Sequence, residues 1–577
     1  MAKFARATDE MKSPLTIVLG TAPAFFALVA MSIVSNILML TSPVFMLQIY
    51  DRVLASRSIP TLVALTVLVI GLFAFYAIIE VLRGRMSTRY SEVFDEELSP
   101  KILAAAIRAR LTPMSRLHDP MRDLDTMRQF YGGPGPSALL DLPWVPIYVM
   151  IVYAFHPLLG HVTVAGALIM LILMLLNEFL SQAPTRELTV EGVKRQTLAE
   201  DARQNAEAVL SMAMLNPILG RWQDTSRGFN TAFLRAADNS SFFASVTKAF
   251  RLLLQSLVLG AGAYLVIVGQ VNAGIMIASS IITSRALAPI EQVVGQWRSF
   301  VAARQASRRT YELLKAAEQK PRASLLPPPR RSFSVNHLTS GPHPRLPPTI
   351  FGINFALRAG DGLGILGPSG SGKSTLVRAM VGVWPAIHGT VRLDDSELPH
   401  YDPHVLGNAV GYLPQTVELF DGTVAQNICR FRTDATMEAI MQAAELSGVH
   451  DLIASLSDGY DTQIGDRGSQ LSAGQRQRIG LARAMFNEPF LIVLDEPNSN
   501  LDAEGENALA RAVLNARNRG AIVAIVAHRP SAITALDKLL FLQAGRQVRF
   551  GTKEEVLQQI APQTAQVANK TEGASNG

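Results

Sequence analysis

Cysteine is nearly absent from this chain of 577 residues, which contains only Cys429. A single thiol cannot form an intramolecular disulfide, and it cannot supply the set of cysteines that a structural zinc site needs. Cys429 falls in the second half of the chain, where we interpret it as a small buried hydrophobic residue. A disulfide scaffold is therefore excluded as the basis of the fold.

Charge is also scarce. Asp, Glu, Lys and Arg make up 17% of the residues, and the net charge is +6. No basic tract with interleaved aromatic residues is present, so nucleic acid is not an expected partner. The mean hydropathy is +0.21, and the apolar residues are concentrated before residue 300. Because the chain is also too long for one core, we predict a membrane-embedded half followed by a soluble half.

Six uncharged or nearly uncharged runs are long enough to cross a lipid bilayer. They lie at about 23–47, 61–82, 139–155, 158–180, 252–269 and 273–290. The first run is longer than the core of a signal peptide, so we expect it to be retained. The second and fourth connections are long and rich in Lys and Arg. The positive-inside rule then places both termini and the soluble half in the cytoplasm.

A glycine-rich stretch between a predicted strand and a predicted helix matches the phosphate-binding P-loop. It contains Gly367, Gly372, Lys373 and Ser374 in the spacing GxxxxGKS. Glycines let backbone N–H groups point inward at a polyphosphate beside a helix N-terminus. The lysine reaches the β- and γ-phosphates, and the serine hydroxyl is a ligand for Mg²⁺. Chance would produce roughly 0.02 such matches in a chain of this length, so we predict a nucleotide site.

Two further motifs fit an ATPase. The apolar run LIVLDEP ends in Asp495 and Glu496, and strand alternation predicts that their side chains point to opposite sides. We expect Asp495 to hold Mg²⁺ and Glu496 to orient the attacking water. The motif LSAGQ, with Ser472 and Gly474, precedes a predicted helix and offers a second anion site. One nucleotide needs only one cradle, so the second implies another nucleotide or another subunit.

Taken in order, the P-loop, GYLPQ, LSAGQ, LIVLDEP, SNLD and VAHRP resemble the ATPase domain of ABC transporters. The six preceding spans are similar to those of an exporter-type half-transporter. The resemblance implies a six-helix all-α transmembrane domain followed by an α/β P-loop ABC ATPase domain. It also implies a head-to-tail homodimer that uses ATP and Mg²⁺.

The resemblance assigns the predicted site residues. Glu496, His528 and Gln415 are the catalytic group, and Gln415 also reports to the membrane domain. Ser374, Gln415 and Asp495 hold Mg²⁺. ATP contacts Gly367, Pro368, Ser369, Gly370, Ser371, Gly372, Lys373, Ser374 and Thr375 of one chain, and Ser472, Gly474, Gln475 and Asp502 of the other. The aromatic residue on which family members stack adenine is missing upstream of the P-loop, and either His343 replaces it or the stacking is absent.

A closer resemblance is carried by FMLQIYDRVL, DLPWVPIY, RALAPIEQVV and GYLPQTVELFDGTVAQNI. These motifs are similar to the permease/ATPase of bacterial type I secretion systems, in the branch without an N-terminal peptidase-like domain. That family exports unfolded polypeptides, such as proteases, adhesins or repeat-containing enzymes with C-terminal signals. It works in the bacterial inner membrane with a periplasmic adaptor and an outer-membrane channel.

We therefore predict five segments. They are a cytoplasmic N-terminal segment (1–22), a transmembrane domain with long cytoplasmic helix extensions (23–315), a Pro-rich linker (316–330), an ABC nucleotide-binding domain (331–560) and a disordered tail (561–577). One alternative keeps the ATPase but changes the cargo to lipid or drug. A second alternative is a sensor or scaffold that uses ATP as a switch, although Glu496 and LSAGQ favour turnover.

Overall fold

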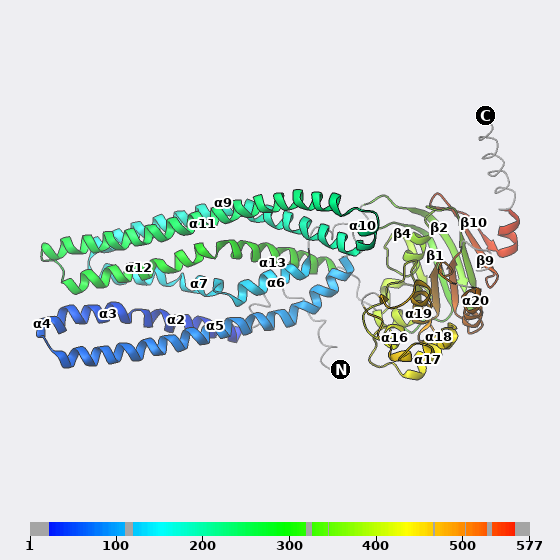
Figure 1. Ribbon diagram of the computed structural model, residues 1–577, viewed down its shortest axis with the longest axis horizontal. Helices are drawn as coiled ribbons and strands as arrows, with labels where there is room; N and C mark the ends of the chain where they lie inside the picture. Colours follow the sequence, from blue (N-terminus) through cyan, green and yellow to red (C-terminus); the bar gives the residue numbers. More distant parts are fainter. Residues whose placement is uncertain are drawn as a thin grey trace, which may run out of the picture. The chain divides into compact units, whose positions relative to one another are not determined.

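The computed structural model describes residues 22–109, 119–318, 326–343, 346–465, 468–501, 503–527 and 533–559. The chain divides into two compact units, one helical and one built on a sheet (Figure 1). The predicted N-terminal segment, apart from Ala22, and the predicted tail lie outside the described residues, as does part of the predicted linker. Each unit is described by itself.

The first unit is entirely helical in its described residues. Its helices are α2 (Ala22–Met39), α3 (Thr41–Gln48), α4 (Leu54–Ser56), α5 (Ile59–Ala109), α6 (Pro120–Gly132), α7 (Gly135–Asp141), α8 (Trp144–Phe155), α9 (Pro157–Gln204), α10 (Ala206–Ser211), α11 (Leu215–Ile267), α12 (Ala273–Gly295) and α13 (Trp297–Glu318), with a π-helical turn η1 (Ile49–Val53) between α3 and α4. Among the described residues, six helical segments are long and apolar enough to cross a membrane, and each overlaps one predicted span. The prediction of six spans is confirmed.

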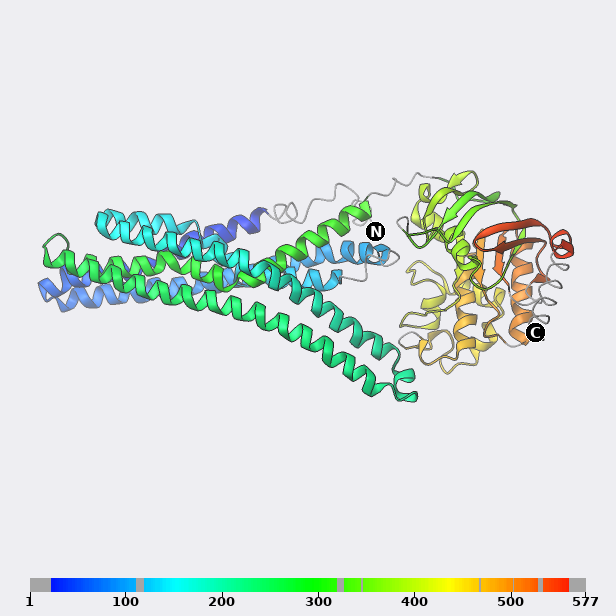
Figure 2. The same cartoon turned by 90° about the horizontal axis from the view of Figure 1, so that it is seen from above.

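Three helices extend well past their apolar spans. α5, α9 and α11 contain 51, 48 and 53 residues. At 1.5 Å per residue they reach about 70–80 Å, more than twice the thickness of a bilayer core. Figure 2 shows that α9 and α11 run side by side and diverge from α5, α6 and α13 towards the end that carries α10. The helical unit is therefore forked at that end.

Prolines occur at three different kinds of position in these helices. Pro143 does interrupt the chain, because it caps α8 after α7 has ended. Pro146 lies in the first turn of α8, where its missing N–H removes no intrahelical bond. Pro289 stays inside α12, and the chain departs from the helix only later, at Gln296.

Two buried charged side chains of the helical unit form an ion pair. Arg83 on α5 donates to Asp141 on α7 over 2.9 Å, and both side chains are buried. From α2, Ser32 Oγ and Asn36 Nδ2 also donate to Asp141 Oδ1, over 2.5 and 2.9 Å. Three helices are thus tied together by one carboxylate. Such a network offsets the cost of placing a charge in an apolar unit.

The second unit is built on a mixed sheet of ten strands among the described residues. They are β1 (Ser332–Ser340), β2 (Ile350–Arg358), β3 (Gly362–Leu366), β4 (Ala386–Leu393), β5 (Ser396–Glu397), β6 (Val410–Leu413), β7 (Leu491–Asp495), β8 (Ile522–Val526), β9 (Lys538–Gln543) and β10 (Arg546–Thr552). Their order is β5-β4-β1-β2-β10-β9-β3-β8-β7-β6. The segment β9-β3-β8-β7-β6 is parallel, and its central strands β3, β7 and β8 are almost wholly buried.

Helices pack against this sheet, in agreement with the predicted α/β class of this domain. The helices are α14 (Lys373–Met380), α15 (Pro403–Ala409), α16 (Val424–Ile428), α17 (Met437–Leu446), α18 (His450–Ala454), α19 (Ala473–Met485) and α20 (Ala503–Asn518). Strands β2, β5, β9 and β10 were not predicted. Only β8 separates β3 from β7 in the sheet, and both run parallel to it. Their carboxyl ends therefore meet at one edge, where a ligand is expected in such folds.

Candidate nucleotide-binding site

The loop between β3 and α14 requires glycine at two positions. Gly367 has φ +150°, and a Cβ atom there would lie 2.1 Å from the carbonyl oxygen of Leu542. Gly372 has φ +95°, and a Cβ atom there would lie 2.6 Å from Cγ2 of Ile350. Neither the backbone conformation nor the space admits another residue. The glycines of the motif thus hold the loop against neighbouring strands, just ahead of the first turn of α14.

Lys373 lies across this loop. Its Nζ donates to the carbonyl oxygens of Gly367 and Pro368, over 2.8 and 2.9 Å. Burial lowers the pKa of Lys373, while the carboxylates of Glu496 and Asp495 act in the opposite direction. The Ser371 hydroxyl oxygen is buried and has no hydrogen-bond partner within the described part of the chain. An ammonium and a spare hydroxyl in one small loop are groups that suit a polyphosphate.

Asp495 ends β7 and is 1% exposed. Burial raises its pKa, and the neighbouring Glu496 adds to this, whereas Ser374, Arg378 and Lys373 oppose it. Although Ser374 lies near enough to act on the pKa, neither carboxylate oxygen has a hydrogen-bond partner of ordinary geometry in the described residues. A buried carboxylate with two spare oxygens beside a hydroxyl fits a hard cation such as Mg²⁺. The donor set therefore agrees with the predicted metal site.

Glu496 faces Gln415. Gln415 follows β6 by two residues, and its Nε2 donates to Glu496 Oε2 over 3.1 Å. We expected strand alternation to send Asp495 and Glu496 to opposite sides. Instead β7 ends at Asp495, and Glu496 has a left-handed backbone with φ +53°. The two carboxylates are separated by a backbone turn rather than by the strand, and such a conformation in a non-glycine residue is uncommon and costly.

Gln477 holds the turn that carries Glu496, and the sequence did not single it out. Its Nε2 donates to the carbonyl oxygen of Pro497 over 2.5 Å and to that of Glu496 over 3.4 Å. Its Oε1 accepts a bond from Asn500 Nδ2 over 2.9 Å. Gln477 is buried on α19. The only feature of the sequence that could have indicated this role is that Gln477 is a polar residue on the buried face of α19.

Ser472 is the N-cap of α19, as the sequence predicted. Its hydroxyl accepts from the backbone N–H of Gln475 over 3.2 Å, and Gln475 Oε1 accepts from the N–H of Ser472 over 2.8 Å. A Cβ atom on Gly474 would lie 2.9 Å from the carbonyl oxygen of Asn500. Within the described residues, no hydrogen bond joins Ser472 to the P-loop. Gln475 therefore serves the helix cap in this chain, and Gly474 permits close packing.

The remaining predicted residues are placed only in part. Thr375, in the first turn of α14, donates its hydroxyl to that of Thr349 over 3.3 Å. Ser369 and Gly370 lie in the exposed part of the P-loop. Asp502 and His528 fall outside the described residues, so their predicted roles are not placed by the structure.

Known proteins match both units. Residues 25–287 match the ABC transporter transmembrane region family, and residues 350–499 match the ABC transporter family. The type I secretion system ATP-binding protein PrsD of Rhizobium meliloti (strain 1021) is 46% identical over 557 residues, covering 96% of each chain. The leukotoxin translocation ATP-binding protein LktB of Mannheimia haemolytica is 27% identical over 543 residues, covering 92% of this chain and 76% of that protein.

A solved structure has the same fold. The structure of a bacterial Atm1-family ABC exporter with ATP bound aligns with a TM-score of 0.82 and 21% identity, covering 93% of this chain and 97% of the other. The predicted fold class is confirmed. By its spans and its ATPase domain, this is a multi-pass membrane protein that binds nucleotide. The chain belongs to the ABC transporter family and, within it, to the type I secretion system ATP-binding proteins.

Proposed function

We propose that the protein uses ATP hydrolysis to export unfolded polypeptides across the bacterial inner membrane. The observation that carries this proposal is the 46% identity to PrsD along 96% of both chains. The described geometry of the nucleotide site supports the ATPase part of the proposal. The name of LktB, a leukotoxin translocation protein, supports a polypeptide as cargo.

For the ATPase step, the P-loop residues bind the polyphosphate through backbone N–H groups, and Lys373 moves from its loop carbonyls to the β- and γ-phosphates. Ser374, Gln415 and Asp495 would hold Mg²⁺, which would neutralise charge on the phosphate oxygens. Glu496 orients a water for attack on the γ-phosphorus. The bond from that phosphorus to the bridging oxygen breaks, and ADP and phosphate leave.

Two chains complete the site in a head-to-tail homodimer. Ser472 begins a long helix, and its anion-binding end has no bond to the P-loop of its own chain among the described residues. A nucleotide on the P-loop of one protomer would meet Ser472 and Gly474 of the other. Asp502 would communicate between the protomers, and His528 would contact the γ-phosphate.

The ATPase domain and both termini would lie in the cytoplasm, a proposal supported by the Lys- and Arg-rich connections between spans. A type I system also implies a periplasmic adaptor and an outer-membrane channel as partners. The cargo would leave the membrane unit directly into that duct. The alternative cargo, a lipid or a drug, would need neither partner.

Peptide-dependent ATP hydrolysis tests the cargo. The full-length protein is reconstituted in lipid vesicles, and its ATPase rate is measured with peptides from C-terminal secretion signals, with added lipids and with amphipathic drugs. We expect the signal peptides to change the rate and the other compounds to leave it unaltered. Stimulation by lipids or drugs, with none by the peptides, would contradict the proposal and favour the alternative. Glu496→Gln serves as the inactive control, and Glu438→Gln, an exposed change on α17, as the matched active one.

A further inference from the structure

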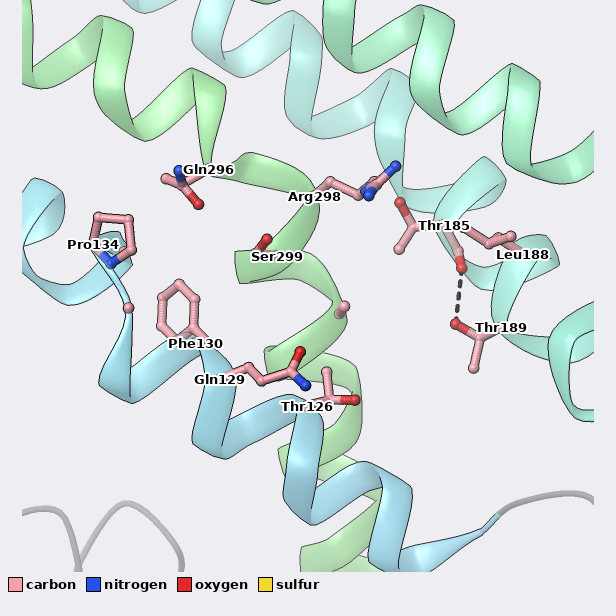
Figure 3. A pocket seen from close by; sticks show the side chains of 13 residues that line it. Thr126, Gln129, Phe130, Pro134, Thr185, Leu188, Thr189, Gln296, Arg298 and Ser299 are labelled. Carbon is pink, nitrogen blue, oxygen red and sulfur yellow. Dashed lines mark hydrogen bonds between the residues drawn. The ribbon is translucent and has the colours of Figure 1, made fainter. Parts of the chain in front are cut away.

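A polar cavity lies where the helical unit begins to fork. Its volume is about 240 Å³, and its walls come from α6, α9 and the α12–α13 junction (Figure 3). Thr126 and Gln129 line it from α6, and Thr185 and Thr189 from α9. These positions follow or precede apolar spans, so the cavity lies at the proposed cytoplasmic face of the membrane.

Arg298 is the one charged residue among those that line the cavity, and no carboxylate faces it there. Figure 3 shows its side chain reaching from α13 towards Thr185 on α9. The guanidinium carbon lies 5.8 Å from the ring centroid of Phe233 on α11. An arginine stacked on a ring keeps its charge and its hydrogen-bond donors available for a ligand.

The same arrangement continues along α11. Phe233 stacks with Phe229, one helical turn away, with 6.3 Å between ring centroids. The guanidinium carbon of Arg195, from α9, lies 3.7 Å from the Phe229 ring and 5.9 Å from that of Trp222. Arginines from two helices thus alternate with aromatic rings of a third.

A third arginine joins from α6. Arg122 donates to Gln196 Oε1 over 3.0 Å, and it lies above Gly192 of α9. A Cβ atom on Gly192 would lie 3.7 Å from Arg122 Nη2 and 3.5 Å from the Phe229 ring. We call Arg122, Arg195, Arg298, Trp222, Phe229 and Phe233 the arginine–aromatic ladder.

The three ladder arginines have neutral partners, whereas others in the same unit do not. Arg309 pairs with Asp123, Arg304 with Glu178, and Arg235 with Glu187. Among the described residues, none of the ladder arginines forms an ion pair. Glu191, four residues before Arg195 on α9, pairs with Lys194 instead. The ladder therefore presents three arginines without an ion-pair partner in the described residues, interleaved with aromatic rings.

We propose that the ladder binds acidic, aromatic-containing segments of the unfolded polypeptide as they enter the membrane unit. Carboxylates would pair with the arginines, and apolar side chains would contact the rings. From Trp222 to Phe233 the ladder covers twelve residues of α11, whose ends are about 16 Å apart. An extended chain spans that length with about five residues. The inference rests on the proposed function and adds that the exported polypeptide contains negatively charged segments.

Direct peptide binding tests the ladder. A short fluorescent peptide of glycine, serine, aspartate and phenylalanine is titrated against the full-length protein in lipid nanodiscs, and anisotropy reports its affinity. A peptide with asparagine in place of aspartate is titrated in parallel. The test variant combines Arg122→Gln, Arg195→Gln and Arg298→Gln. The control combines Arg128→Gln, Arg203→Gln and Arg227→Gln, which removes the same charge from exposed, acid-paired sites on α6, α9 and α11.

We expect the aspartate peptide to bind more tightly than the asparagine peptide, with the preference weakening as salt rises. The test variant should bind the aspartate peptide about tenfold more weakly, while the control variant binds as the native protein does. A variant with three lysines should recover part of the affinity, because charge returns without stacking.

Equal affinities for the two peptides, or equal losses in the test and control variants, would overturn the ladder but leave polypeptide export standing. The test variant could instead lose a preference for anionic over neutral nanodisc lipids while its affinity for the peptide stays unchanged. That result would assign the arginines to lipid headgroups and would also overturn the ladder proposal. Absence of any peptide binding, together with ATPase stimulation by lipids or drugs, would instead remove the proposed function itself.

Discussion

The amide of Gln415 donates a hydrogen bond to the carboxylate of Glu496, with 3.1 Å between Nε2 and Oε2. One residue follows β6 and the other follows β7, so neighbouring strands bring them together. The hydrogen bond from Gln415 fixes the orientation of the Glu496 carboxylate, which we propose orients the attacking water. It also links the catalytic position to the loop after β6.

Gln415→Ala tests this link. The change removes the hydrogen bond and one proposed Mg²⁺ contact without altering the charge of the site. We expect kcat for ATP hydrolysis to fall about 10- to 100-fold, because a mispositioned general base is inefficient. ATP affinity should change far less. Steady-state kinetics and equilibrium binding separate the two, and an unchanged kcat would contradict the positioning role.

Gln477→Leu tests the support of the catalytic turn. The leucine fills a similar volume, but the carbonyl oxygen of Pro497 loses the Gln477 donor, and that of Glu496 keeps only the backbone N–H of Ser499. An unsatisfied buried carbonyl costs about 1–3 kcal/mol, and the strained backbone of Glu496 would relax. We predict a lower kcat and a lower melting temperature. Gln477→Glu adds a control, since it keeps the shape and removes the donor; activity equal to the native enzyme would contradict the assignment.

Asp495→Asn tests the metal site. Because burial raises the pKa of this carboxyl in the folded state, its ionised form destabilises the fold at pH values above that pKa. Replacing it with a neutral amide should leave the nucleotide-free protein at least as stable at neutral pH. The extra thermal stability conferred by Mg²⁺ with ATP should disappear. Retention of a full Mg²⁺-dependent shift would remove Asp495 from the metal site.

The Arg83–Asp141 pair tests how the membrane helices are held. Asp141→Leu alone leaves the buried Arg83 with only the partly exposed Glu80 as an ion-pair partner, over 3.3 Å. We therefore expect a loss of stability below the roughly 3–5 kcal/mol of a wholly unpaired buried charge. Adding Arg83→Met should restore much of the lost stability, because no buried charge remains. Thermal unfolding in detergent gives both values. The exposed pair Arg227 and Asp224 is the control, and its double replacement should matter by less than about 1 kcal/mol.

The sequence predicted those parts of the site that contiguous residues encode. Gly367, Gly372 and Lys373 form their cradle within one turn between a strand and a helix, so spacing alone describes it. The six membrane spans could also be predicted from contiguous residues, because a long apolar run is stable as a helix that crosses the membrane. Strands β9 and β10 were missed, although the apolar run of β9 was visible.

Contacts between segments that are distant in the sequence could not be predicted. Gln477 contacts the turn after β7 from α19, and the residues next to it in the sequence give no sign of that contact. The ladder draws its arginines from α6, α9 and α13, and only packing reveals that Arg298 faces Phe233. The backbone of Glu496 was interpreted as a strand, because alternation is the default after four apolar residues. Tertiary packing overrides such local patterns.

Comparison of secreted proteins tests polypeptide export most directly. A bacterium that carries the native gene is compared with one carrying chromosomal Glu496→Gln, and with one carrying the exposed change Glu438→Gln. We predict that one or a few specific proteins disappear from the medium of the Glu496→Gln strain and accumulate inside its cells, while the control strain secretes normally. An unchanged medium, with the variant protein present in the membrane, would contradict polypeptide export and favour a lipid or drug as cargo.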